Sequence, residues 1–172
     1  MSTKVASPKR VLKNTYACGE RYTLRLKKET VVIADKEKNL TIEITLQRLA
    51  VLLSCMPDIN QAVTQLVATQ FVKYKQHIGG AWFVSVASGY PCVEFRRFYM
   101  PVFGFEEKPT KSGVAIRLSE WSAFGAALKR MTDDNPHLLQ VQTCGIHHNQ
   151  EEAMQCAECY PFPSITFGST TT

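Results

Sequence analysis

One stretch of the chain, residues 78–131, restricts the fold more than any other part of the sequence. Residues 82–86 and 92–99 each alternate apolar and polar side chains, and a turn at 88–91 separates them. A period of two is typical of strands that are buried on one face. A third such run, 114–118, leads into a segment whose apolar residues recur at helical spacing. This order predicts an α+β fold, in which a curved antiparallel sheet is backed by a helix.

The preceding part of the chain follows the same order. Residues 11–18, 22–26, 31–34 and 40–44 are β-branched or alternating runs and are expected strands. Thr45 is placed to cap a helix. Pro57 is expected to stop or kink that helix, and residues 58–69 form a further helical segment.

The second half ends in a similar way. Residues 71–75 form another alternating run, Gly79 and Gly80 a turn, and Ser119 the expected cap of the last helix. We therefore predict two ββββα repeats in one chain, with a single α+β domain of unrelated halves as the alternative. The expected organisation is a flexible basic tail at 1–10, a degenerate first repeat at 11–69, a second repeat at 70–136 and a Cys/His-bearing tail at 137–172.

Composition and the pattern of apolar runs indicate the cellular location of the protein. Hydrophobic residues make up 45% of the 172-residue chain, which is enough for a packed core. No apolar run approaches the roughly 18 residues of a membrane span, and the polar N-terminus lacks a secretory signal. We therefore expect an intracellular protein without a membrane partner, nuclear if its source is eukaryotic or viral. Its cysteines are then reduced, and Cys18, Cys55 and Cys92 are interpreted as inert thiols.

The charged and aromatic residues of the second half suit single-stranded nucleic acid. The formal net charge is +5, which is compatible with a polyanion if the fold gathers the charge on one face. Cations follow the phosphates of a single strand, and aromatic rings stack on its bases. Alternatively, the charges lie on a solvated face and the rings fill the core, as we expect for Trp82, Phe83, Phe95 and Trp121. The candidate binding residues are Lys73, Lys75, Tyr90, Arg96, Arg97, Phe98, Lys108, Lys111 and Arg117, with Phe103 and Phe105 as further rings for stacking.

Three motifs carry a family resemblance. They are Ile78-Gly79 with Phe83-Val84-Ser85-Val86, the strand from Val93 to Met100, and Lys108-Pro109 followed by Gly113 and Ser119-Glu120-Trp121. In this order they resemble the C-terminal domain of the transcriptional coactivator positive cofactor 4, a family that binds single-stranded DNA. The resemblance covers about residues 78–131.

The resemblance implies a four-stranded sheet backed by a helix, with two copies pairing through their helices. The first half of the chain would supply the second copy, as in the tandem arrangement of Whirly and purine-rich-element-binding proteins. Arg96, Lys108 and Lys111 match basic positions of the family, and Tyr90 matches an aromatic that stacks on bases. Pro91 and Cys92 stand where the family has lysines, Arg97 replaces an acidic residue, and the loop after Met100 is longer.

A second signal lies in the tail. Cys144-x-x-His147 is followed, after eight residues, by Cys156-x-x-Cys159. Two close pairs of sulfur and nitrogen donors suit a tetrahedral zinc site. Zinc would order a tail that is too short for a core of its own. His148 is an alternative ligand to His147, and reduced thiols without a metal are the alternative to zinc.

Together these features predict a sequence-tolerant single-stranded-nucleic-acid-binding protein, which acts in transcription or replication. Its expected partners are single-stranded DNA, or RNA, and a second copy in a homodimer or within the chain as a pseudo-dimer. The alternative is a structural or protein-interaction module, such as a viral or complex subunit, that kept the fold without strong nucleic-acid binding. An enzyme that uses Cys144 with His147 or His148 is the weakest interpretation, because no pocket-forming motif accompanies that cluster.

Overall fold

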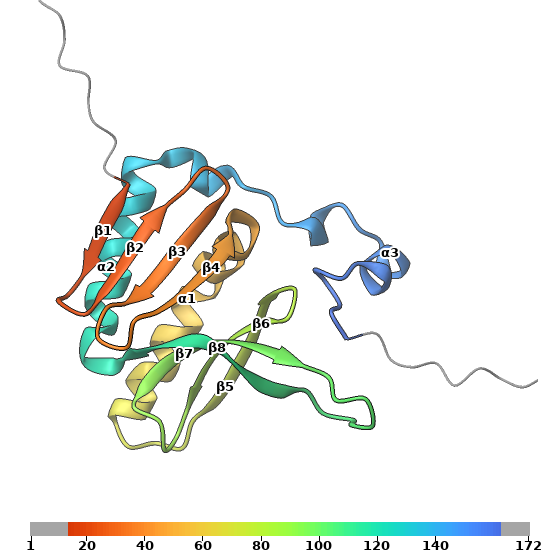
Figure 1. The fold of residues 1–172 in the computed structure, drawn as a ribbon, viewed down its shortest axis with the longest axis horizontal. Coiled ribbons are helices and arrows are strands. Elements are labelled where there is room, and N and C mark those ends of the chain that lie inside the picture. The colour runs from red at the N-terminus through yellow and green to blue at the C-terminus, as the bar shows by residue number, and fades with distance from the viewer. Residues whose placement is uncertain (1–13, 163–172) are drawn as a thin grey trace, which may run out of the picture.

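The computed structural model describes residues 14–162, which form two consecutive ββββα units (Figure 1). Each unit contributes a four-stranded antiparallel sheet whose strands pair in chain order. The predicted α+β class and the two repeats are therefore confirmed. The first unit consists of β1 (Thr15–Cys18), β2 (Tyr22–Leu26), β3 (Thr30–Asp35), β4 (Leu40–Thr45) and α1 (Leu46–Val67), and the second of β5 (Lys73–Gly79), β6 (Trp82–Ala87), β7 (Cys92–Tyr99), β8 (Lys108–Arg117) and α2 (Leu118–Asp134).

Some expected elements differ in extent. The first strand begins at Thr15, and the proposed basic tail at 1–10 lies outside the described residues, as do positions 11–13. The strand expected at 71–75 begins at Lys73 and continues to the Gly79-Gly80 turn. Both glycines have positive φ angles, of 132° and 54°, a conformation that glycine adopts without a steric penalty.

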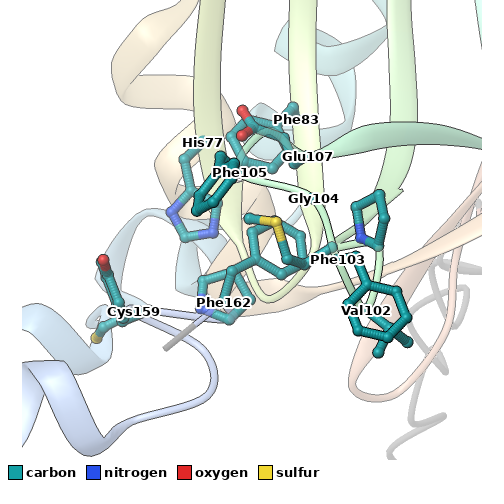
Figure 2. A pocket seen from close by; sticks show the side chains of 13 residues that line it. His77, Phe83, Val102, Phe103, Gly104, Phe105, Glu107, Cys159 and Phe162 are labelled. Carbon is teal, nitrogen blue, oxygen red and sulfur yellow. The ribbon is translucent and has the colours of Figure 1, made fainter. Parts of the chain in front are cut away.

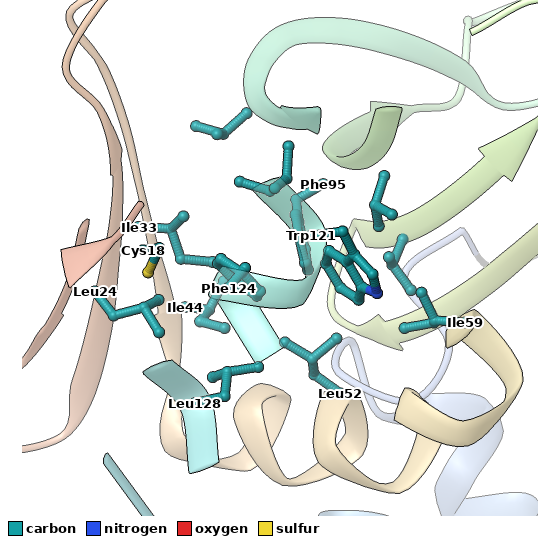
Figure 3. Close-up of a cluster of buried hydrophobic side chains, with 14 of the residues drawn as sticks. Cys18, Leu24, Ile33, Ile44, Leu52, Ile59, Phe95, Trp121, Phe124 and Leu128 are labelled. Carbon is teal, nitrogen blue, oxygen red and sulfur yellow. The ribbon is translucent and has the colours of Figure 1, made fainter. Parts of the chain in front are cut away.

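The two units share one hydrophobic core because each helix packs against the sheet of the other unit. Helix α1 contacts β5 and β6, whereas α2 contacts β1 and β2. At the centre, the rings of Trp121 and Phe124 stack at 5.2 Å, and Phe95 of the second sheet lies beside both (Figure 3). The Trp121 indole N–H donates to Asn60 Oδ1 of α1 at 2.8 Å, so the buried nitrogen is satisfied between the two helices.

The helix boundaries confirm one expected cap and correct two other predictions. Thr45 caps α1, since its hydroxyl accepts from the Arg48 N–H. Of the predicted stop or kink at Pro57, the stop is wrong: α1 runs through Pro57, and buried residues on both sides, Cys55 and Ile59, hold the adjacent turns in the core. The predicted cap at Ser119 is also wrong, because α2 follows β8 directly and the Leu118 N–H donates to the carbonyl of Pro91 instead.

The chain after α2 continues in short helical turns. Two 3-10 helices, Pro136–Gln140 and Cys144–Ile146, precede α3 (Gln150–Gln155). Asn149 and Glu152 form a capping box at the start of α3, which satisfies its first N–H groups. Among the helices of residues 14–162, none is both long and apolar enough to cross a membrane.

A buried ion pair closes one end of the first sheet. Arg21 Nε and Nη2 donate to the two carboxylate oxygens of Asp35 at 2.8 and 2.7 Å, and both side chains are buried. Asp35 Oδ1 also accepts from the backbone N–H groups of Glu37 and Lys38, so it holds the β3–β4 turn. The Arg21 guanidinium holds the pKa of Asp35 below its ordinary value.

We expect Asp35→Asn to destabilise the protein by about 3–5 kcal/mol, because the buried Arg21 would lose its buried partner and keep only the exposed carboxylate of Glu37, 2.9 Å from Nη1, as a counter-charge. Because the pKa of Asp35 is lower in the folded state than in the unfolded state, its ionisation stabilises the folded protein. This stabilisation is fully present above the unfolded pKa of about 3.9 and is lost as the pH falls through the folded-state pKa. Urea unfolding at pH 7 and pH 3 measures both effects. Asp133→Asn, which breaks the exposed pair with Lys129, is the control and should change stability by less than about 1 kcal/mol.

Candidate functional site

The outer face of the second sheet is the face that points away from the two helices. Alternate residues of its strands, such as Val84, Val93 and Phe95, are buried in the core, so their neighbours in sequence face outward. By strand register, the candidate residues on this outer face are Lys73, Lys75, Arg96, Phe98 and Arg117.

A row of aromatic rings crosses this outer face. The rings of His77 and Phe83 lie 5.1 Å apart, and Phe83 meets Phe98 edge to face, also at 5.1 Å. Lys75 Nζ lies 3.9 Å from the centre of the Phe98 ring. The expectation that Phe83 belongs to the core is wrong, because its position in β6 puts it on the outer face, whereas Phe95 and Trp121 are buried as predicted.

The outer face of the first sheet has no such row among its described residues. By register it carries Thr23, Ala34 and Thr41 across its middle and Arg25 near Glu43. Small and neutral side chains offer neither stacking surface nor net charge. The two repeats therefore share a fold but differ in the chemistry of the exposed sheet.

Three of the candidate cations already have acidic partners. Lys75 Nζ lies 2.7 Å from Glu107, Arg96 Nε 2.5 Å from Glu94, and Arg117 Nη2 3.4 Å from Glu37. Arg96 also donates to the carbonyl of Thr110, and it lies against Gly113, where a Cβ atom would be 3.1 Å from its guanidinium carbon. Among residues 14–162, the candidates that form no ion pair are Lys73, Arg97, Lys108 and Lys111.

The candidate residues do not all share one face. Arg97 pairs in register with Trp82, and Lys108 with Tyr99, so Arg97 and Lys108 lie on the side opposite the aromatic row. Tyr90 is 74% exposed in the β6–β7 turn, at the end of the sheet where Lys73 and Arg117 lie. The sequence predicts one surface for all the candidate residues, but the structure gathers only those on the outer face and at its two ends, and it leaves Arg97 and Lys108 on the other side.

A groove of about 850 Å³ lies at the other end of the outer face. Figure 2 shows that its side chains come from the sheet, from the loop between β7 and β8, and from the C-terminal segment. Phe103 and Phe105 of the loop are 97% and 95% exposed. The residues that line this groove with aromatic or imidazole rings are His77, Phe83, Phe103, Phe105, Tyr160 and Phe162.

A cluster of potential metal ligands stands beside the groove. One ligand atom from each of Cys144, His148, Cys156 and Cys159 lies within 4.8 Å of the others, so the cluster could hold a metal ion. The Sγ atoms of Cys144 and Cys159 are 3.1 Å apart. Donors bound to one zinc ion at about 2.3 Å lie about 3.8 Å apart, so small shifts would complete a tetrahedron. The histidine in the cluster is His148, the alternative ligand, rather than His147, which ends the preceding 3-10 helix.

Two cysteines of the cluster have pKa values shifted in opposite directions, one by backbone N–H groups and the other by a neighbouring thiol. The N–H groups of Cys159 and Glu158 lower the pKa of Cys156 to about 7, because they stabilise its thiolate. The hydrogen bond with Cys144 raises the pKa of Cys159 to about 12. The carboxylate of Glu152 lies 3.8 Å from His148 Nδ1, where it can orient the imidazole ring.

The cluster of potential metal ligands is attached to the body of the protein through Glu158, which sequence reasoning missed. Its carboxylate accepts two hydrogen bonds from Arg48 of α1, at 2.8 and 2.7 Å, and its carbonyl accepts one from the Gly80 N–H. A Cβ atom on Gly79 or Gly80 would collide with Arg48 and Glu158. The Cys-x-x-Cys spacing indicated a ligand pair, but only the folded structure shows that the residue between them is the anchor.

Comparison of the chain with family models, with curated proteins and with solved structures gave no match of any of the three kinds.

We expect Arg48→Ala to release the C-terminal segment while the repeats stay folded, because the two hydrogen bonds to Glu158 are lost. Hydrogen exchange should accelerate at residues 156–162 and at the Gly79-Gly80 turn. Lys27→Ala, which removes an exposed pair with Glu43, is the control and should leave those amides unchanged. Equal exchange in both variants would show that the anchor is elsewhere.

Proposed function

We propose that the protein binds single-stranded nucleic acid along the outer face of its second sheet. The observation that carries this proposal is the aromatic row of His77, Phe83 and Phe98 with the ammonium of Lys75 beside it. The three rings are partly exposed, and such rings can stack on bases of any sequence while adjacent cations neutralise phosphates. The resemblance of residues 78–131 to the positive cofactor 4 family points to the same ligand.

The distribution of charge supports a path for the strand along β5. Lys73 and Lys75 follow one another on the outer face, and Tyr90 extends from the same end of the sheet as Lys73. Stacking contributes about 1–3 kcal/mol per base, so two or three rings are enough for substantial affinity. Lys75 and Arg96 would have to give up their carboxylate partners before they could bind phosphates. We therefore expect Lys73 and Lys111, which have no ion pair, to contribute more binding free energy per charge.

We further propose that the two repeats act as an intramolecular pseudo-dimer. The reciprocal packing of α1 and α2 on the opposite sheets supports it, because pairing through the helices is what a dimer of such units requires. Of the two outer faces formed by residues 14–162, only that of the second sheet carries rings, so we propose one binding face per chain. This activity would serve transcription or replication inside the cell, in the nucleus if the source is eukaryotic or viral, with DNA or RNA as ligand.

For the Cys144, His148, Cys156 and Cys159 cluster we propose structural zinc. The sulfur-rich donor set favours zinc over hard cations such as Mg²⁺ or Ca²⁺. The four residues come from a segment with short helices and few buried side chains, which lacks a core of its own. A zinc ion bound there would hold the two ligand pairs together and preserve the contact between Glu158 and Arg48.

An interaction module for another protein is the second candidate. Exposed apolar side chains in the β7–β8 loop, above all Val102, Phe103 and Phe105, favour it, because large apolar patches are typical of protein interfaces. The two candidates predict different salt dependence, since phosphate binding releases counterions and an apolar protein interface does not.

The nucleic-acid proposal is tested by fluorescence anisotropy with a labelled single strand at several salt concentrations. We expect affinity above that for a duplex of equal length, and a slope of log K against log salt of about −0.7 per phosphate neutralised. A double Lys73→Gln and Lys111→Gln variant should bind about 3- to 30-fold more weakly with a shallower slope. Arg25→Gln, on the outer face of the first sheet, is the control. Equal affinity for duplex and no salt slope would exclude the proposal.

The zinc proposal is tested with Co²⁺, whose absorption bands report tetrahedral thiolate ligation. We expect one ion per chain and a loss of affinity as the pH falls from about 8 to 6, because the thiols and the imidazole must lose their protons. His148→Ala should weaken binding at least about tenfold, whereas the matched His147→Ala should not. Equal losses in both variants would contradict the ligand set.

A further inference from the structure

We infer that the groove between the β7–β8 loop and the C-terminal segment is a pocket for an unpaired base of the bound strand. The inference rests on the proposed function and names the part of the ligand that enters the groove. A volume of about 850 Å³ is within the size range of small-ligand pockets. Its lining consists mainly of rings and apolar side chains, which match the flat faces of a base rather than a phosphate.

The groove is continuous with the proposed binding face. His77 and Phe83 belong both to the aromatic row and to the lining of the groove, so a strand that follows the row arrives at its entrance. Glu107 also lines the groove and holds Lys75 by an ion pair of 2.7 Å, which places that ammonium at the junction of the two. A phosphate at this junction would lie near the Lys75 ammonium while the attached base enters the groove.

The loop side of the groove carries large rings that the fold does not bury. Phe103 and Phe105 are almost wholly exposed, at 97% and 95%, and neither belongs to the core cluster. Exposed rings of this size gain stacking and burial only when a ligand arrives. Glu106 and Glu107 end the loop and offset Lys108 and Lys111 in charge. The rings, rather than a surplus of positive charge, are therefore what this side of the groove offers to a strand.

The opposite side of the groove depends on the metal cluster. Cys159 is both a potential metal ligand and a lining residue, and Figure 2 shows it with Phe162 on this side of the groove. Tyr160 and Pro161, which lie between them in sequence, line the groove as well. Glu158, one residue earlier, is held by Arg48 and Gly80. The contacts of Glu158 and the clustering of the potential metal ligands therefore fix the position of the C-terminal side of the groove. The pocket is complete only when this segment is docked.

The test compares two single strands of equal length and charge, one intact and one in which a central nucleotide is abasic, by anisotropy with the full chain. We expect the intact strand to bind about 5- to 150-fold more tightly, the range for one stacked base. A double Phe103→Ala and Phe105→Ala variant should lose this preference and bind both strands as the wild type binds the abasic one. Phe71→Ala, which removes a ring that is 84% exposed and lies outside the groove, should retain it.

The outcomes separate the pocket from the proposed function. Salt-dependent binding in which the abasic site, moved along the strand, never weakens affinity would overturn the pocket and leave the proposed function standing. Absence of binding to any single strand would overturn both. Concentration-dependent dimerisation of the wild type that the double Phe variant abolishes, together with unchanged strand binding, would assign the groove to a second copy of the chain and also overturn the inference. Thermal melting should show the double variant folded, since both rings are exposed.

Discussion

The exchange of helices between the two sheets is the interaction on which the whole structure depends. A four-stranded antiparallel sheet needs a cover for its apolar face, and each sheet here obtains much of that cover from the helix of the other repeat. Trp121 and Phe124 of α2 pack beside Phe95 of the second sheet, while α2 also contacts β1 and β2 of the first, so neither repeat has a complete core alone. Because the helices pack between the two sheets, neither α1 nor α2 covers the outer face of a sheet.

The two outer faces, which neither helix covers, have different chemistry. The first carries small neutral side chains across its middle and the opposite charges of Arg25 and Glu43, whereas the second carries a continuous row of rings and cations. One repeat can then serve mainly as scaffold while the other presents the surface. Tyr22 illustrates this division, because its hydroxyl donates to the Ala115 carbonyl and accepts from the Arg117 N–H, which joins the first sheet to the end of β8.

The C-terminal segment joins the metal cluster, the helix α1 and the groove through a few contacts. Arg48 lies in the first turn of α1, Glu158 lies between two potential metal ligands, and Gly80 lies in the turn that ends β5. A change at any of these positions reaches the others, because a cysteine on one side of Glu158 also lines the groove. The potential metal ligands and one side of the groove thus belong to the same anchored segment.

The sequence by itself determined the elements and their order, because alternation and helical spacing are local properties that any strand or helix must satisfy. It also indicated the two cysteine pairs. It did not decide that Phe83 faces out while Phe95 faces in, that Pro57 stays inside a helix, or that His148 rather than His147 joins the cluster. Those outcomes came from tertiary structure, since strand register, core packing and the path of the tail depend on residues far apart in the chain.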